Sequence, residues 1–440
     1  MSTTVSYEKT AFVAMDIGKN VHWFGSFAGQ ELETVTPAFK LRSNQDGLEQ
    51  VQEQLDGLLE GGRYERVVLG HEPTGIYHEN WARALLNRYK PYLGADSCPQ
   101  LAYRFVNPKV VKKRREGLTN GRYRKSDQID LWAIAHCLRD GAGYPALLAD
   151  GEELWLGQWT RRQRQLQQRQ REAEMQLLAQ LDQLWPGLLV DVRRFEAMHP
   201  ELAAPVPLVG TKPLTRQSVQ AILTHCPDPH QFLALGVTGI QAFFRQHMGR
   251  CGEATARKAY QIVAEAVLPP PEVAALLAAQ LRWEANDLAQ LLAQKEAMEA
   301  EAEARLPQTA AWVLTTIPGI SPVLAARYLG YLKHPQRFTT PAEVWAYAGF
   351  DPVLEESGDY RRVGKISRQG HPGLRDTLYL MGFHTARHLP AVKEAYRKAL
   401  ARGKGKVGAT LHAAHKTNRL CHRLLYDQLP YDPTYHDLLP

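Results

Sequence analysis

At 440 residues the chain is too long for one typical domain, and it has ample material for two or three separate cores. Its formal net charge of +7 favours an anionic partner such as nucleic acid, and its five scattered cysteines, none in a C-x-x-C pair, argue against a zinc ribbon or a disulfide framework. With neither a targeting segment at the N-terminus nor an apolar run that could cross a bilayer, we expect a soluble protein of a reducing, intracellular compartment.

The first elements predicted are two buried strands joined as a hairpin. An apolar run from Ala11 to Gly18 resumes from Val21 to Phe27 after a short polar break. Asp16 lies inside the first strand, where burial of a lone carboxylate is unfavourable. It therefore needs a partner, a metal ion or an opening to solvent, unless it only accepts hydrogen bonds from the turn that follows.

A second acid follows the next predicted strand. Residues 44–59 have helical spacing, and 66–70 are expected to form a central strand, with Glu72 just past its end. In open sheets with helical crossovers, ligands bind beyond the carboxyl ends of strands, so residues 71–75 form a candidate site loop. The alternative is an ordinary connection in which Thr74 caps a helix over 77–89. The N-terminal part is predicted to be α/β.

Residues 107–125 are strongly basic and lead directly into a helix that carries two more acids. Asp127 and Asp130 lie one turn apart on that helix, so both carboxylates can share a divalent cation. An isolated pair of this kind is more often solvated acid at a helix start. A basic run beside it draws phosphate towards the acids, as a metal-dependent nuclease requires, which favours a nucleic-acid substrate. The candidate contacts are Lys109, Lys112, Lys113, Arg114, Arg115 and Lys125.

The middle of the chain predicts two long amphipathic helices. They cover residues 152–184 and 272–306, and the second has near-heptad spacing of apolar residues. Together they indicate an antiparallel coiled-coil arm. The segment between them, at about 186–271, is expected to be a helical insert at the tip of the arm. No chemistry is apparent in it, and packing or oligomerisation is the role that we assign to it.

The last part is predicted to be mainly helical. A P-G turn at 318–319 before a small-residue helix resembles a helix-hairpin-helix element, whose amides can meet a phosphate. Residues 355–371 are expected to form a loop rich in Ser, Gly, Arg and Lys. In it, Ser357 is either a hydroxyl nucleophile beside guanidinium groups or a turn residue of a phosphate-binding loop.

Several motifs together resemble one family. They are V-A-M-D-I-G-K (13–19), E-P-T-G (72–75), V-N-P-K (106–109), K-S-D-Q-I-D (125–130), I-P-G-I (317–320), A-G-F-D-P (348–352), S-G (357–358), G-K-I-S-R-Q-G (364–370) and L-R (374–375). In this order, and around a coiled coil, they resemble the insertion-sequence transposases of the DEDD type, serine recombinases guided by a bridge RNA. The family more often has Thr and Arg at the positions of Ser126 and Gln128.

The resemblance implies a domain plan and an active site. Residues 1–150 would form a RuvC-like domain of the RNase H fold, 151–307 the coiled-coil arm and 308–440 a transposase domain. An acidic tetrad of Asp16, Glu72, Asp127 and Asp130 would hold Mg²⁺, a hard cation that suits carboxylates. Ser357 would attack a DNA phosphodiester and hold the strand as a phosphoserine. Our own candidates for phosphate contacts near it are Arg361, Arg362, Lys365, Arg368 and Arg375.

The resemblance also implies partners. They are donor and target DNA, a non-coding guide RNA and a second copy of the chain, because the tetrad and the serine would meet across subunits of a homodimer or tetramer. A bacterial or archaeal cytoplasm, at the nucleoid, would be the location. A complex with RNA that stays monomeric on DNA in light scattering would exclude the shared site.

Two other functions compete with a recombinase. One is a RuvC-type junction nuclease that hydrolyses DNA with water and metal ions. The other is a nucleic-acid-binding protein with a vestigial acidic site. Ser357→Ala separates the first alternative from the recombinase, since only the recombinase needs the hydroxyl; normal transposition by Asp16→Ala would favour the second.

Overall fold

The computed structural model describes residues 6–73, 75–94, 96–118, 126–204, 208–209, 214, 216–357 and 360–436, and at 352–357, 360–365 and 435–436 it describes the backbone alone. The chain divides into two compact units. The first combines Met1–Gly157, Thr316–Gly319 and Tyr328–Pro440, and the second combines Gln158–Thr315 and Ile320–Arg327. Each unit is described below by its own elements.

The N-terminal part is a six-stranded mixed sheet of order β3-β2-β1-β4-β5-β6. Its strands are β1 (Thr10–Ile17), β2 (Val21–Ala28), β3 (Glu33–Arg42), β4 (Arg66–His71), β5 (Gln100–Phe105) and β6 (Tyr144–Pro145). The hairpin predicted at residues 11–27 is confirmed as the antiparallel pair β1 and β2, and the central strand predicted at 66–70 is confirmed as β4, which runs parallel to β1.

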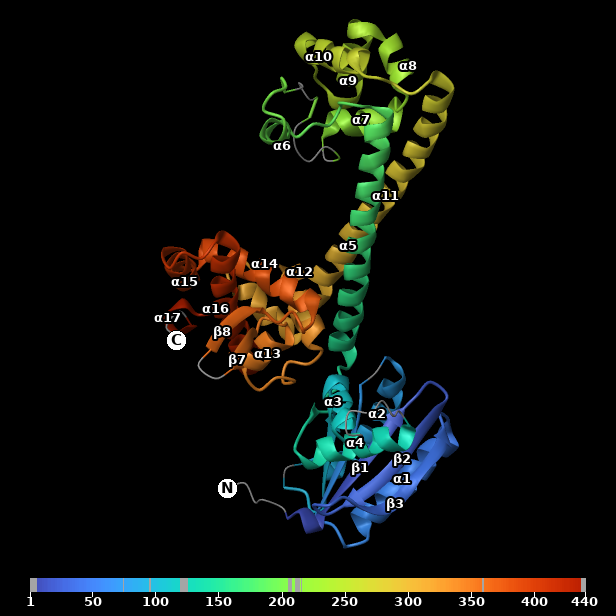
Figure 1. The fold of residues 1–440 in the computed structure, drawn as a ribbon, viewed down its shortest axis with the longest axis vertical. Coiled ribbons are helices and arrows are strands. Elements are labelled where there is room, and N and C mark those ends of the chain that lie inside the picture. Colours follow the sequence, from blue (N-terminus) through green and yellow to red (C-terminus); the bar gives the residue numbers. More distant parts are fainter. Residues whose placement is uncertain are drawn as a thin grey trace. The chain divides into compact units, whose positions relative to one another are not determined.

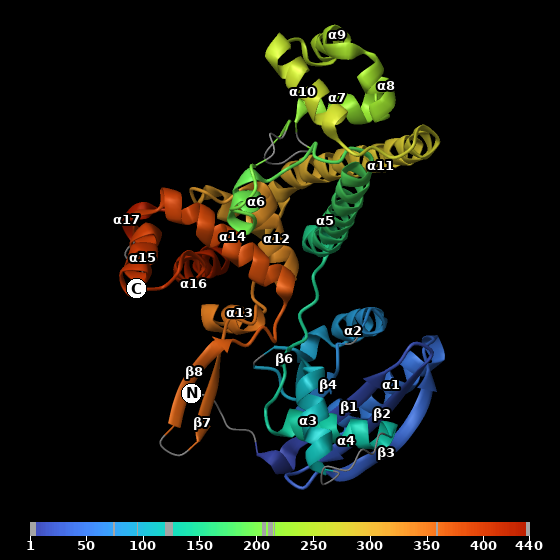
Figure 2. The ribbon, with the colours of Figure 1, turned by 45° about the horizontal axis from the view of Figure 1, so that its top comes forward.

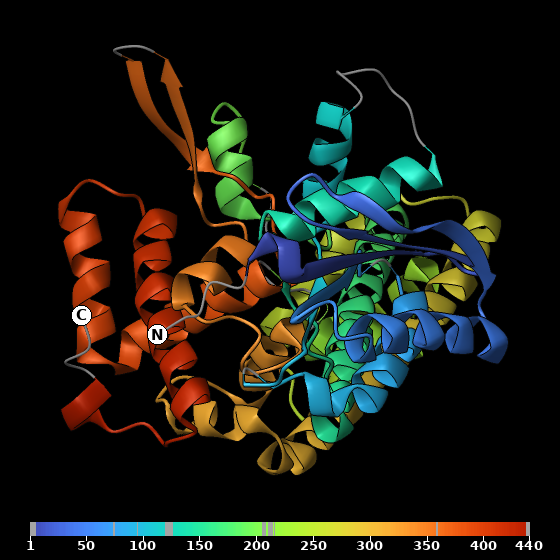
Figure 3. The same cartoon turned by 90° about the horizontal axis from the view of Figure 1, so that it is seen from below.

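Helices cover both faces of this sheet, as Figure 3 shows with the blue helices on one side of the strands and the teal helices on the other. Helices α1 (Gln45–Glu60) and α2 (Tyr77–Arg88) pack on the face formed by the odd-numbered residues of β1. Helices α3 (Pro108–Leu118) and α4 (Asp127–Arg139) pack on the even-numbered face, with Phe12 and Ala14. Strand residues alternate between two cores because their period is two.

The two long helices predicted from sequence are confirmed as α5 (Gly151–Leu184) and α11 (Pro271–Arg305), which lie side by side in Figure 1. They run antiparallel. Near the start of α5, the Nε1 atom of Trp159 donates to the carbonyl oxygen of Met298 near the end of α11 at 2.8 Å. Near the end of α5, Nε2 of Gln180 donates to Oε1 of Glu284 in the first half of α11 at 3.5 Å. No helix in the described ranges is both long and apolar enough to span a bilayer.

The insert between these helices is helical, as predicted. It contains α6 (Val192–Met198), α7 (Gln217–His225), α8 (Pro229–Ala234), α9 (Gly236–Met248) and α10 (Glu253–Glu265). Its core is aromatic, with Phe232 buried against Trp185 and Phe244. The Nε1 atom of Trp185 donates to the carbonyl of Pro227 at 2.7 Å, which ties the end of α5 to the insert.

The C-terminal part is mainly helical. Its helices are α12 (Pro322–Leu332), α13 (Pro341–Tyr347), α14 (Pro372–His388), α15 (Pro390–Ala401), α16 (Lys406–Asp427) and α17 (Pro433–His436). Short 3₁₀ turns precede it at Leu306–Gln308 and Ala310–Thr316, and two others lie in the N-terminal part at Tyr7–Lys9 and Lys90–Tyr92. Helices α14, α15 and α16 pack on one another. Gly382 of α14 permits this packing, because a Cβ atom there would lie 2.5 Å from the Cα of Ala414 on α16.

The prediction of a loop over residues 355–371 is wrong for most of that range. Strands β7 (Pro352–Ser357) and β8 (Tyr360–Ile366) form an antiparallel hairpin there, seen in orange in Figure 2. The β-favouring residues Val353, Tyr360, Val363 and Ile366 lie on either side of a Gly-Asp pair, which is a hairpin signal in the sequence. The many charged residues of the segment obscured it.

Candidate functional site

Asp16 and Glu72 lie next to each other at the carboxyl ends of two parallel strands. Met15 of β1 pairs with His71 of β4, and the two acids are the residues that follow in each chain. By alternation from Phe12 and Ala14, Asp16 belongs to the face that α4 covers. Both acids are half-buried. The structure therefore brings together two acids that are 56 positions apart in the sequence.

Helix α4 carries the other two acids of the predicted tetrad over the same face. The Oγ atom of Ser126 caps the helix by accepting from the Ile129 amide at 3.3 Å. The helix crosses the sheet, and at β4 it fits closely, since a Cβ atom on Gly70 would lie 2.5 Å from the Cδ2 of Leu138. Asp127 is exposed in the first turn of α4, whereas Asp130 is 7 % exposed.

Asp130 is held by a cation from the neighbouring helix. The Nη1 atom of Arg115, on α3, donates to Asp130 Oδ1, and both side chains are largely buried. Arg115 was predicted from sequence as a phosphate contact. In this structure its guanidinium group compensates a buried carboxylate, an interaction that joins α3 to α4; its contact with phosphate stays a prediction.

The four acids are of the chemical type that a hard divalent cation binds, and they belong to the same layer of the domain. In this structure they do not form a complete set of metal ligands. In the described part of the chain no three His, Cys, Asp or Glu side chains lie close enough to hold one ion. Oxygen ligands are those that Mg²⁺ prefers. The Arg115 guanidinium supplies the positive charge beside Asp130. A cation that binds Asp130 Oδ1 therefore has to displace the Arg115 side chain from that oxygen.

The Arg115–Asp130 ion pair predicts a large loss of stability on substitution. We expect Arg115→Gln to lower the free energy of unfolding by about 3 kcal/mol, because breaking a buried pair leaves an uncompensated charge. Arg114→Gln is the matched control: its pair with Asp140 is more exposed and should be worth about 1 kcal/mol or less. Urea denaturation followed by tryptophan fluorescence measures both, and equal effects would contradict a special role for Asp130.

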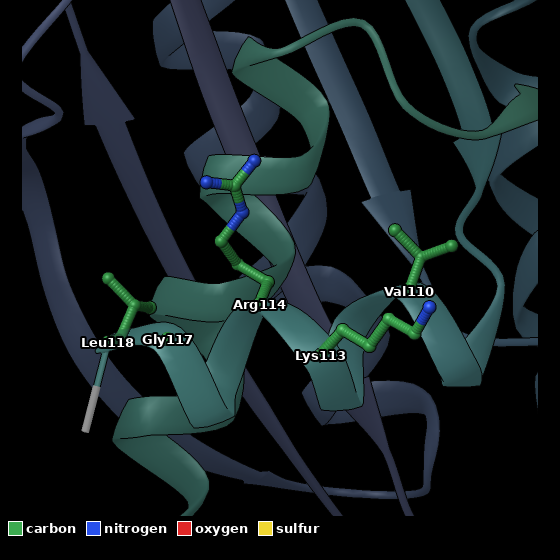
Figure 4. Close-up of a pocket in the computed structure, with 5 residues that line it drawn as sticks. All are labelled: Val110, Lys113, Arg114, Gly117 and Leu118. Atoms are coloured by element: carbon green, nitrogen blue, oxygen red, sulfur yellow. The ribbon is translucent and has the colours of Figure 1, made fainter. Parts of the chain in front are cut away.

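The cations of the basic helix α3 differ in burial and in their partners. Lys109, Lys112 and Lys113 are exposed, and Lys112 pairs with Glu116 at 3.9 Å. Arg114 is half-buried and paired with Asp140. Beside the helix lies a cavity of about 520 Å³, whose described lining is Val110, Lys113, Arg114, Gly117 and Leu118; Figure 4 shows that these residues all belong to α3. Lys125, the predicted contact next to Asp127, lies outside the described residues.

A buried histidine behind Glu72 was not foreseen from the sequence. His71 is fully buried, its Nδ1 lies 3.0 Å from the carbonyl oxygen of Glu72, and its Nε2 lies 2.8 Å from the hydroxyl of Tyr103. A carbonyl only accepts, so Nδ1 carries the proton, and the hydroxyl donates to Nε2; burial raises the pKa of Tyr103, which keeps that hydroxyl protonated. His71 thereby fixes the backbone of Glu72.

Acid should destabilise the protein through this histidine. Burial lowers the pKa of His71 from 6.5 to about 3. Between these values the unfolded chain binds the proton and the folded one does not, so stability is complete above pH 6.5 and falls as the pH falls. We expect protonation linked to His71 to lower the free energy of unfolding by roughly 2 to 3 kcal/mol as the pH falls from 6.5 to 4.5.

The His71→Asn variant isolates this effect from that of the carboxylates. Asparagine keeps a donor near the position of Nδ1 but does not titrate. Urea midpoints measured from pH 7.5 to 4.5 should therefore fall less steeply in the variant than in the wild type. Parallel curves would show that His71 does not stay neutral in the folded protein.

The hairpin β7–β8 carries the predicted nucleophile and two of its predicted neighbours. Ser357 ends β7 and pairs with Tyr360, Arg361 lies opposite Glu356, and Arg362 lies opposite Glu355. Alternation along the strands puts Arg362 in the set of positions that includes Ser357 and puts Arg361 in the other. The side chains of Ser357, Arg361, Arg362 and Lys365 lie outside the described ones.

The base of the hairpin is a close contact between two motifs that the sequence singled out. A Cβ atom on Gly370 would lie 2.2 Å from the amide nitrogen of Gly349, so only glycine fits there. The Oγ atom of Ser367 donates to Asp351 Oδ1 at 2.8 Å. Nη1 of Arg375, a predicted phosphate contact, donates to the carbonyl oxygen of Ala348 at 3.0 Å, so this side chain also stabilises the fold. Arg368, another predicted phosphate contact, is exposed.

Comparison with known proteins gives separate matches to the two ends of the chain. A family model for DEDD transposases of the IS110 type, described as "Transposase", matches residues 13–186 and contains Asp16, Glu72, Asp127 and Asp130. A second model, described as "Transposase IS116/IS110/IS902 family", matches residues 311–397 and contains Ser357. Together they cover more than half of the chain and leave most of the insert unmatched.

A curated relative bears the same family name. The chain is 29 % identical over 149 residues to the "Insertion element IS110 uncharacterized 43.6 kDa protein" of Streptomyces coelicolor. The match covers 34 % of this chain and 37 % of that relative, so it spans well under half of either protein. On the two family models and this relative, the chain belongs to the IS110 family of DEDD transposases.

Proposed function

We propose that the protein is an insertion-sequence transposase that cuts and rejoins DNA through Ser357, assisted by a divalent cation at the acidic tetrad. The observation that carries the proposal is that Asp16 lies on β1 and Glu72 directly follows the parallel neighbouring strand β4, on the sheet that the helix with Asp127 and Asp130 covers. A mixed sheet with acids at these points is the arrangement expected of an RNase H-type domain. The family membership of both halves of the chain supports the same function.

The acids would hold Mg²⁺ and the basic helix would bring phosphate to them. When bound, the ion supplies Lewis-acid stabilisation of charge on phosphoryl oxygens. Other groups of the chain position the acids: His71 bonds the Glu72 backbone, and Arg115 pairs with Asp130. The exposed Lys109 and Lys113 would attract the DNA backbone. Without these cations four carboxylates would repel a phosphodiester.

Ser357 would act as the nucleophile from a hairpin whose base is fixed. Attack of its Oγ on phosphorus forms the serine–phosphate bond and releases the other strand end as a free hydroxyl, and attack by a second DNA end reverses the step. The serine hydroxyl loses one proton and the leaving oxygen of the DNA gains one, so the step transfers a proton overall from Ser357 to the released hydroxyl. The close Gly349–Gly370 contact and the Ser367–Asp351 hydrogen bond support the rigid base. Arg362 is the cation that we place beside the phosphate.

A guide RNA and a second subunit complete the proposal. Pairing with RNA would read the DNA sequence, since base pairing can take over specificity from side chains. The net charge of +7 suits both nucleic acids. Sequencing RNA that co-purifies with the protein tests the guide, and light scattering of the complex on DNA tests the subunit number; a monomer would exclude a site shared across subunits.

The reaction itself is tested with purified protein, its RNA and donor and target DNA. We expect joined products with Mg²⁺ and none with a chelator. Cut ends without joined products would instead indicate a nuclease, and binding without any cutting would indicate a nucleic-acid-binding protein. A denaturing sequencing gel measures cut and joined strands, and a native gel measures binding.

A further inference from the structure

A second basic site lies in the C-terminal part, away from the hairpin segment. Helices α14, α15 and α16 line a cavity of about 550 Å³. Its described lining includes Phe383, Arg387, Lys393, Tyr396, Arg397 and Leu400. The cavity has the size of a small-ligand pocket, and its described lining combines three cations with two aromatic rings and contains no acid.

Helix α15 presents this chemistry on one face. Lys393, Arg397 and Leu400 recur at helical spacing and are exposed, whereas Val392 and Ala399 are buried on the other side of the helix. The nearest acid in sequence, Glu394, already pairs with Lys398 at 3.6 Å. The pocket side of α15 is thus a cationic surface that its own helix does not neutralise.

The three cations of the pocket have no anionic partner among the described residues. Arg387, Lys393 and Arg397 make no ion pair there. Like charges around one cavity repel one another and cost stability until an anion binds between them. An arrangement of this kind favours a ligand with phosphate groups.

The aromatic side chains add a second requirement. Phe383 is 40 % exposed, and the guanidinium carbon of Arg387 lies 4.2 Å from its ring centroid. Unpaired bases stack on aromatic rings and on guanidinium planes, whereas paired bases in a duplex present only their edges. A concave site with cations and an accessible ring therefore suits one unstacked nucleotide of a strand.

We propose that this pocket binds an unpaired nucleotide of a single nucleic-acid strand, its phosphate at Arg387, Lys393 and Arg397 and its base beside Phe383 and Tyr396. The inference deepens the proposed function, because it names where a single strand of the nucleic-acid partner is held. An RNA strand and a displaced DNA strand share this chemistry.

Fluorescence anisotropy with the full-length protein tests the site, in chelator so that no catalysis occurs. The probes are a labelled 20-nucleotide RNA, a DNA strand of the same sequence and a DNA duplex. We expect Phe383→Leu to weaken single-strand binding about tenfold and to leave duplex binding unchanged, since it removes stacking alone. Arg397→Gln should weaken single-strand binding and reduce the salt dependence by about one counterion.

Two control variants have the same loss of charge outside the pocket. Lys398→Gln removes the cation paired with Glu394, and Arg402→Gln removes an exposed cation after the end of α15. Thermal melting of every variant checks the fold. Loss for RNA or for DNA strands in the pocket variants alone supports the proposal and identifies the strand.

The proposal is overturned if the pocket variants bind single strands like the controls, or if they weaken duplex binding as much as single-strand binding. These results are separate from the fate of the proposed function. Pocket variants that bind single strands and exchange DNA normally would exclude the proposed role of the pocket without affecting the proposed transposase function. A wild-type protein that binds none of the three probes would exclude both the role of the pocket and the proposed function.

Discussion

In the proposed reaction we expect Asp16→Asn to abolish DNA cutting and joining by the full-length protein, assayed with any RNA that co-purifies, by a factor of about 10³ or more. A metal ion contributes several kcal/mol to the stabilisation of a phosphoryl-transfer transition state, and each 1.4 kcal/mol is roughly a factor of ten in rate. Asparagine keeps the size of Asp16 and removes its charge. The strand position of Asp16 next to Glu72 makes it the acid whose loss should matter most.

Asp46→Asn is the matched control for this variant. Asp46 is exposed in the first turn of α1, which packs on the opposite face of the same sheet. Initial rates of joined-product formation at saturating Mg²⁺ compare the two variants with the wild type. Normal joining by Asp16→Asn would mean that the acids are vestigial and that the N-terminal part only binds nucleic acid.

Ser357→Ala should abolish both strand exchange and the covalent protein–DNA adduct, by about 10⁴-fold or more, because loss of a nucleophile removes the reaction path that depends on it. Labelled DNA that stays with the protein after denaturation measures the adduct. A junction nuclease would keep its metal-dependent cutting in this variant, so retained cutting without an adduct favours that alternative.

The two arginines of the hairpin supply a control within the same strand. By strand alternation, Arg362 occupies a position on the same face of the hairpin as Ser357, and Arg361 occupies one on the opposite face. Both arginines lie opposite a glutamate on β7. Arg362→Gln should therefore slow adduct formation more than Arg361→Gln does. The reverse order would place the phosphate on the other side of the hairpin.

The sequence predicted the part of the fold that depends on local periodicity. The buried hairpin of β1 and β2, the central strand β4 and the long helices α5 and α11 each have an apolar pattern that only one element fits. It also predicted where Asp16 and Glu72 fall relative to their strands. Strand β3 escaped prediction because most of its residues are exposed or half-buried, which leaves no apolar run.

The remaining features depend on partners distant in sequence. Arg115 resembled its basic neighbours until the packing of α3 on α4 placed it against Asp130. His71 looked like one more residue of a site loop, and its contacts with Glu72 and Tyr103 depend on the register of β4 and β5. The pocket of α14, α15 and α16 likewise exists only after three helices pack.

The central claim is that Ser357 carries the DNA strand in a reaction that needs the acids. Mapping the covalent adduct by protease digestion and mass spectrometry tests it most directly. We predict one nucleotide-bearing peptide, modified at Ser357, in wild-type reactions with Mg²⁺, and no such peptide in Asp16→Asn. An adduct on any other residue, or joined DNA formed without an adduct, would contradict the account.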